Sequence, residues 1–122
     1  MHAGIYRFLG YLENTNNIPP EMAREFIRLK YNSLGYILNT KQYIGLLSKF
    51  DDEKECRYYL EKNKFKHIND VLVYGARYGS MIIVNYAIEK GARDWNWGMC
   101  GAAKGGHMDI VEFFNEKLVD LR

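Results

Sequence analysis

The chain contains an internal repeat, which constrains its fold more than any other feature. Residues 71–92 align with residues 98–119 at a constant offset of 27 positions. The same residue types recur in the pairs Ala76 and Ala103, Gly79 and Gly106, Ile83 and Ile110, Val84 and Val111, and Lys90 and Lys117. So short a period predicts one small structural unit copied along the chain. Such a unit cannot bury its own apolar face, so neighbouring copies must cover it.

A third and weaker copy lies upstream. Residues 51–63 align with residues 79–91 at an offset of 28, which pairs Tyr58 with Tyr86. Asp51 stands where Gly79 does, so this copy lacks the glycine. The change of offset predicts a one-residue insertion or deletion in a loop between the copies.

Each unit is predicted to be two helices joined by a tight glycine turn. Residues 98–104 are rich in Gly and Ala, so a neighbouring backbone can approach this first helix closely. Gly105 and Gly106 then end it, because a glycine after a helix adopts the left-handed conformation without steric cost. Ser80 is the expected N-cap of the second helix in the preceding unit. In the last unit the second helix starts at His107 and carries an apolar stripe of Ile110, Val111, Phe113 and Phe114.

The two better copies resemble the ankyrin repeat. The segments "GARYGSMIIVNYAIEKGARD" and "GAAKGGHMDIVEFFNEKLVD" are similar to the family's succession of small residues, a glycine turn and an apolar helix. The short period and the paired Trp are similar to the divergent ankyrin repeats of large DNA viruses. The family's Thr-Pro-Leu-His start is replaced by "DVLV" (70–73) and "WGMC" (97–100). The hydrogen bonds that this Thr and His make between repeats must therefore be absent or replaced.

The resemblance implies an all-α fold, a helix–turn–helix solenoid of about three ankyrin-like repeats with a helical N-terminal cap. We place the cap at residues 1–39 and the repeats at residues 40–122. The repeats divide into a degenerate unit at 40–69 and two better units at 70–96 and 97–122.

The N-terminal segment does not show the repeat. Pro19 and Pro20 followed by Glu21 are typical of a helix start. The same residues also resemble the opening of an F-box, a motif that docks ubiquitin-ligase adaptors. A capping helical hairpin and an F-box-like segment both stay open, and the cap is the interpretation that solenoid ends require.

Charge and composition exclude several classes of function. The formal net charge is only +2, with acids and bases interspersed, so we expect no nucleic-acid binding. No apolar run has transmembrane length and no signal peptide is evident, so we expect no membrane association. The two cysteines, Cys56 and Cys100, stand apart, which indicates neither a zinc site nor a disulfide framework and favours the intracellular, cytoplasmic compartment. Cys100 lies on the small-residue face and is expected to be buried.

No catalytic, metal or cofactor constellation is predicted. Lys104 precedes Gly105 and Gly106, whereas a phosphate loop places its Lys after the last glycine. A metal ligand at His107 would need a second ligand three or four residues later, where the chain has Ile110 and Val111. We therefore expect a protein that is not an enzyme and holds no cofactor.

The resemblance implies binding of a protein partner through the repeat surface. Exposed candidates are residues that flank the matched turns and the loop between units, namely Tyr74, Arg77, Tyr78, Arg93, Asp94, Trp95 and Lys104. The loop is expected to carry both Trp95 and Trp97, either as anchors on a partner or as plugs over Gly98 and Gly101, with the plug favoured. The alternatives are an adaptor that recruits clients to a ubiquitin ligase and a structural subunit of a viral assembly. The sequence determines neither the partner nor the oligomeric state.

Overall fold

The chain is all-α throughout the part that the structure describes. The computed structural model describes residues 18–30 and 38–120, and these contain seven helices and no strand. The helices are α2 (Pro20–Lys30), α3 (Thr40–Leu47), α4 (Glu53–Lys62), α5 (Ile68–Arg77), α6 (Met81–Glu89), α7 (Trp95–Gly105) and α8 (Met108–Asp120). The expected fold class, all-α, is confirmed at this level.

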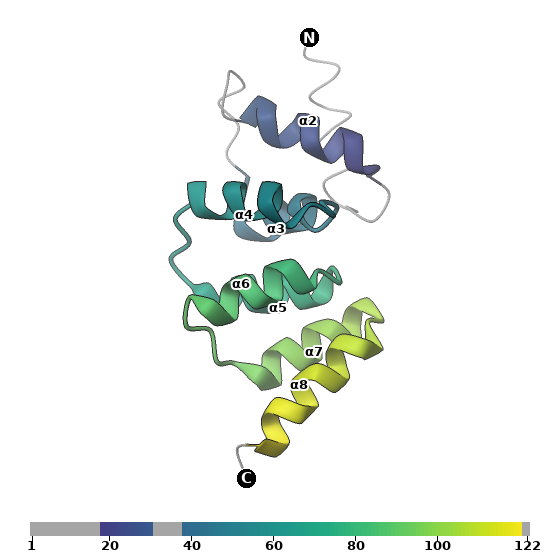
Figure 1. Ribbon diagram of the computed structural model, residues 1–122. Helices are drawn as coiled ribbons and strands as arrows, with labels where there is room; N and C mark the ends of the chain where they lie inside the picture. The colour runs from purple at the N-terminus through teal and green to yellow at the C-terminus, as the bar shows by residue number, and fades with distance from the viewer. Residues whose placement is uncertain (1–17, 31–37, 121–122) are drawn as a thin grey trace.

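The helices form layers that follow one another in chain order (Figure 1). Helices α5 and α6 pair closely, as do α7 and α8, while α3 and α4 form a more open pair upstream. The first helix of each pair packs on the next, α3 on α5 and α5 on α7, and α4 also touches α6. Because each pair is only two helices thick, its apolar side is buried by the adjacent pair.

The period of the sequence is also the period of the helices. The first helices α3, α5 and α7 begin at Thr40, Ile68 and Trp95, which are 28 and 27 positions apart. The second helices α4, α6 and α8 begin at residues 53, 81 and 108, again 28 and 27 apart. The two sequence offsets therefore relate structural units of the same kind.

Matching glycine turns join the two helices of the downstream pairs. Gly79 and Gly106 have φ of +79° and +77°, in the left-handed region that suits glycine. The next N–H reaches back to the helix, from Ser80 to the Gly75 carbonyl and from His107 to the Ala102 carbonyl, both at 2.9 Å. These bonds satisfy carbonyls that a helix end leaves unpaired. The Ser80 hydroxyl also caps α6 by accepting the Ile83 N–H, as predicted.

Gly105, which directly precedes Gly106, is required for a different reason. A Cβ at Gly105 would collide with the Arg77 carbonyl oxygen and with the His107 ring. One at Gly101 would lie 2.7 Å from the Val73 carbonyl oxygen. The backbones of α5 and α7 thus approach each other over a stripe of small residues, as the sequence predicted. Gly106, in contrast, has open space around it.

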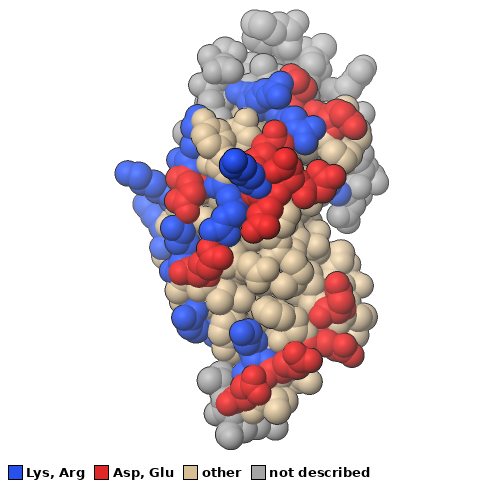
Figure 2. Space-filling model, in the orientation of Figure 1, with Lys and Arg blue, Asp and Glu red and all other residues tan. Residues whose placement is uncertain are grey.

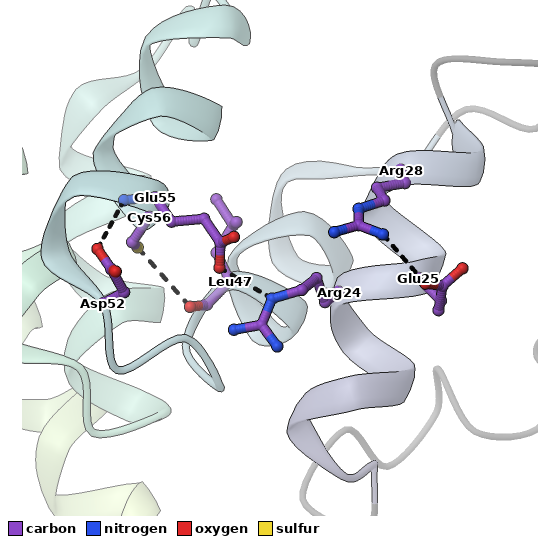
Figure 3. A network of polar contacts seen from close by, with 7 residues as sticks. All are labelled: Arg24, Glu25, Arg28, Leu47, Asp52, Glu55 and Cys56. Carbon is purple, nitrogen blue, oxygen red and sulfur yellow. Dashed lines mark hydrogen bonds and ion pairs between the residues drawn. The ribbon is translucent and has the colours of Figure 1, made fainter.

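The upstream pair is built without these glycines. The Asn39 side chain caps α3 by accepting the Gln42 N–H, and the Gln42 side chain accepts the Asn39 N–H in return. The Asp52 carboxylate accepts the Glu55 N–H and so caps α4 (Figure 3). The Tyr43 hydroxyl donates to the Tyr59 carbonyl at 2.8 Å and ties the two helices together.

Helix α2 covers the end of the stack next to α3. It begins at Pro20 with Glu21 in the first turn, as predicted, and buries Ala23 and Ile27. Its Arg24 guanidinium donates to the Glu55 carboxylate at 2.9 Å (Figure 3). It also lies 5.3 Å from the centre of the Phe50 ring. These contacts agree with a capping role for this helix. The rest of the predicted cap, residues 1–17 and 31–37, lies outside the described residues, so the boundary at residue 39 and the F-box-like interpretation stay predictions.

Candidate functional site

A partly exposed face runs along α5 and α7. On α5 it includes residues that recur every three or four positions and so share one side of a helix. We call this surface the α5–α7 face and define it as Asp70, Val73, Tyr74, Arg77 and Tyr78 together with Trp97, Cys100 and Lys104 of α7. The α7 members are exposed, while most of the α5 members are half-buried. Four of the sequence-predicted candidates, Tyr74, Arg77, Tyr78 and Lys104, belong to it.

The face has a hollow at the N-terminal ends of the two helices. The hollow has a volume of about 260 Å³ and is lined by Asn69, Asp70, Val73, Tyr74, Asp94 and Trp97. It brings together two of the sequence-predicted residues, Tyr74 and Asp94. The Trp97 indole is 61% exposed and forms one wall. An apolar ring beside two carboxylates, Asp70 and Asp94, suits a side chain that is apolar along its length and cationic at its tip.

The opposite end of the face is basic. Arg77 and Lys104 lie in the last turns of α5 and α7, and Lys49 lies just beyond α3, so each unit places one cation at the same position. A cation is favoured there by the negative end of the helix dipole. Burial lowers the pKa of Lys49, whereas Lys104 is exposed. The α5–α7 face therefore has acidic and basic ends.

Asn69 is a site residue that the sequence reasoning missed. Its side-chain oxygen accepts the backbone N–H groups of Arg93 and Asp94, at 3.0 and 3.1 Å. These bonds fix the loop before α7 and thereby one side of the hollow. They are hydrogen bonds between successive units. The recurrence of Asn at 69 and 96, at the repeat offset, was the signal that could have revealed it.

Arg93 is exposed, as predicted, but it is engaged within the chain. Its guanidinium donates to the Ala92 carbonyl at 2.7 Å and to the Ile88 carbonyl at 3.1 Å. It also lies 5.9 Å from the centre of the Trp95 ring. These contacts hold Arg93 against the end of α6, so it does not project toward the α5–α7 face.

The two tryptophans differ, and the prediction that Trp95 is exposed in a loop is wrong. Asp94 caps α7 by accepting the Trp97 N–H, so the helix begins at Trp95 and includes both rings. Trp95 is only 8% exposed and packs on Phe114 with ring centres 6.1 Å apart. Trp95 is therefore buried, but Phe114 covers Gly98 and Val73 covers Gly101, so neither tryptophan is the predicted plug over these glycines. Trp97 provides the exposed aromatic surface.

The prediction that Cys100 is buried is also wrong. Cys100 is exposed, because the side of α7 that carries it faces no further helix in the described chain. Cys56 is the buried cysteine, with its sulfur 3.7 Å from the Leu47 carbonyl (Figure 3). Burial raises the pKa of the Cys56 thiol to about 12, so this thiol stays protonated and unreactive in the folded protein.

The His107 side chain packs between the glycine turns of two successive helix pairs. Its ring lies against the backbone of Gly79 and Gly105, where a Cβ at either position would collide with it. Within residues 18–30 and 38–120 no three His, Cys, Asp or Glu side chains gather as metal ligands would. None of the helices in these ranges is both long and apolar enough to cross a bilayer.

The chain matches no known protein-family profile, no curated protein and no solved structure.

Proposed function

We propose that this chain is an ankyrin-like solenoid that binds a protein partner through the α5–α7 face, without catalysis and without a cofactor. The observation that supports this most is the equivalence of surface positions in successive units. Asp70 and Trp97 occupy one position of the repeat, and Arg77 and Lys104 occupy another. A surface built from repeated positions suits an extended segment that crosses the helices.

The polarity of the face indicates the chemistry of the partner. The hollow offers the Trp97 ring together with the carboxylates of Asp70 and Asp94, so it fits a Lys or Arg side chain. The other end offers Arg77 and Lys104, which fit an acidic group. We therefore propose an extended segment with a basic residue at one end and an acidic residue at the other.

The test begins with affinity purification from the native cell, followed by measurement of binding to the isolated partner. Trp97→Ala is expected to weaken binding by more than about tenfold, because an exposed aromatic in a hollow is a typical anchor. Arg77→Glu with Lys104→Glu is expected to weaken it further by opposing the acidic end. Tyr58→Ala is the matched control, since Tyr58 is an exposed aromatic on α4, away from this face.

Unchanged affinity in all the α5–α7 variants would rule out this face. A Tyr58→Ala variant that alone lost the partner would move the binding surface to α4.

A further inference from the structure

A second hollow lies at the N-terminal ends of α3 and α5, beside the hollow of the α5–α7 face. Its volume is about 320 Å³, and its lining includes Asn39, the N-cap of α3, and His67, the N-cap of α5. Asp70 lines both hollows. The N-caps of the first helices, Asn39, His67 and Asp94, are 28 and 27 positions apart. The hollows are therefore neighbours at one edge of the stack, the second between α3 and α5 and the first between α5 and α7.

The two hollows differ in charge. Exposed Lys64 and Lys66 line the second hollow. The first contains the Asp70 and Asp94 carboxylates beside the Trp97 ring. We call the second the basic hollow and the first the acidic hollow. Figure 2 shows Lys and Arg side chains gathered along the left edge of the molecule, at the height where Figure 1 draws the chain passing from α4 to α5.

The two lysines of the basic hollow are not neutralised within the described residues. Neither forms an ion pair or a cation–π contact there, whereas Lys90 on α6 pairs with Glu61 at 2.9 Å. Asp70, the carboxylate of the lining, forms no ion pair with a described residue either. Two ammonium groups and the His67 ring can donate to several oxygens at once, which suits a phosphate better than a carboxylate.

Packing holds the loop that carries these lysines in place. Phe65, which lies between them in the sequence, is half-buried and also lines the hollow. Its ring packs against the fully buried Tyr43, with ring centres 6.1 Å apart. At the end of α3, Asn39 is held by its capping box with Gln42. A site whose backbone is already fixed loses less entropy when a ligand binds.

The distance between the hollows sets the spacing of the groups that they bind. Helix α5 packs on both α3 and α7. Packed helices lie about 8–10 Å apart, so the two hollows are separated by about one such spacing. An extended chain advances about 3.3 Å per residue. Side chains about three positions apart, on an extended segment that crosses α5, therefore reach both hollows.

We propose that the basic hollow binds a phosphorylated residue of the partner segment whose cationic residue occupies the acidic hollow. This binding rests on the proposed function, because the acidic hollow anchors the segment. An arginine there lies on the Trp97 ring and donates to the carboxylates of Asp70 and Asp94. A phosphoserine or phosphothreonine about three positions away accepts hydrogen bonds from Lys64 and Lys66. Phosphorylation of the partner then controls its affinity.

The probe is a fluorescently labelled peptide, Gly-Arg-Ala-Ala-Ser-Gly with the serine phosphorylated, whose affinity for the full chain is measured by fluorescence anisotropy. The peptide with unmodified serine is the matched control. Both are also made in the reversed order, because a segment can cross α5 in either direction. Phosphorylation is expected to tighten binding about tenfold in one of the two orders, as two partly exposed ion pairs allow.

Charge reversal in the basic hollow is expected to reverse this preference. Lys64→Glu with Lys66→Glu should abolish the gain and make the chain prefer a peptide that has lysine in place of the phosphoserine. Arg28→Glu with Lys54→Glu makes the same change in net charge at exposed residues of α2 and α4, and should keep the gain. An equal loss in both double variants would show a general charge effect and would overturn the proposal.

A phosphorylated peptide with alanine in place of arginine tests whether the two hollows act together. It is expected to bind about tenfold more weakly, because it lacks the group held by Trp97. Affinity equal to that of the arginine peptide would overturn the proposal, as would no measurable binding of any peptide.

Trp97→Ala distinguishes this inference from the proposed function. The variant is expected to weaken the phosphorylated and unmodified peptides alike, because it changes only the acidic hollow. If Trp97→Ala weakens binding but phosphorylation adds nothing in the original chain, the basic hollow is refuted and the α5–α7 proposal stands.

Discussion

The upstream pair, α3 and α4, and the last pair, α7 and α8, solve the same packing problem in opposite ways. In the last pair two residues separate the helices, and Gly98 of α7 leaves room for the Phe114 ring of α8. In the upstream pair five residues separate the helices, no left-handed glycine is present, and aromatic side chains fill the wider space. Ring pairs there join Tyr43 to Phe65 and Phe50 to Tyr59, with centres 6.1 and 5.9 Å apart.

The difference can be followed at one pair of equivalent positions. Gly98 in α7 leaves room for Phe114, whose Cζ would lie 2.8 Å from a Cβ at that glycine. One unit earlier the same positions hold Val71 and Ala87, and in the upstream pair they hold Tyr43 and Tyr59. The last pair thus matches Phe with Gly, the middle pair Ala with Val, and the upstream pair Tyr with Tyr. The period of the helices is conserved although the residues that set their separation are not.

The largest loss of stability is expected at Gly105, where α7 contacts the backbone of α5. Gly105→Ala places a methyl group against the Arg77 carbonyl, a backbone atom that cannot rotate away, and is expected to cost about 2–3 kcal/mol of unfolding free energy. Gly106→Ala has free space and strains only the backbone, so about 1 kcal/mol is expected. Urea denaturation followed by circular dichroism measures both. Equal losses would mean that α5 and α7 do not approach as closely as described.

The two cysteines test the same contrast through their reactivity. Cys100, exposed on α7, is expected to react with a thiol reagent about a hundredfold faster than Cys56, which needs the α3–α4 pair to open. Folding raises the Cys56 pKa from its ordinary 9.0 to about 12, so the protonated thiol is favoured in the native state. The free energy of unfolding that the buried, protonated Cys56 thiol contributes is fully present below pH 9. It is lost as the pH rises from 9 toward 12, because the unfolded chain releases the proton first.

Single substitutions separate the two thiols. Cys100→Ala should leave only the slow reaction and Cys56→Ala only the fast one. A fast reaction of Cys56 in the folded chain would contradict the burial of the α3–α4 contact.

A smaller effect is expected from the polar bond that ties the upstream pair. Tyr43→Phe keeps the buried ring but removes the hydroxyl that donates to the Tyr59 carbonyl, at an expected cost of about 1 kcal/mol. Tyr58→Phe, which changes an exposed ring on the same helix pair, should cost nothing measurable. If both variants were as stable as the original chain, the aromatic ring alone would hold these helices together.

The smallest effect is expected from the ion pairs between the upstream pair and the middle pair, α5 and α6. Arg57→Ala removes the bond from α4 to Glu89 on α6, and both side chains are partly in water. The expected loss is about 0.5 kcal/mol at low salt and less at high salt. Denaturation at two salt concentrations checks this. A salt-independent loss would indicate that the stem of Arg57 matters by packing, since its guanidinium also lies 5.6 Å from the centre of the Tyr86 ring.

The repeat made much of the helical layout predictable from the sequence. The glycine turns at Gly79 and Gly106, the N-cap at Ser80 and the start of α2 at Pro20 each depend on local chemistry, and each prediction is confirmed. The constant offset then gave the spacing of the helices. None of these steps needed knowledge of tertiary contacts.

The exposure of individual side chains was less predictable. The sequence predicts Trp95 in a loop, because no local signal indicates that Asp94 caps a helix that begins at Trp95. The burial of Trp95 depends on its contact with Phe114, nineteen positions away in the sequence. Cys100 was expected to be buried because its neighbours are small, but burial also requires a further unit on that side. In the hollow, Tyr74 and Asp94 were found individually, whereas their grouping depends on the bonds of Asn69.

The central claim is that successive helix pairs stack turn upon turn, and proton NMR of the His107 ring tests it most directly. The ring lies against Gly105 of its own turn and Gly79 of the preceding one, so nuclear Overhauser effects to the α protons of both glycines are predicted. Effects to Gly105 without any to Gly79 would show that the last pair folds but does not stack on the one before it, which would contradict the account.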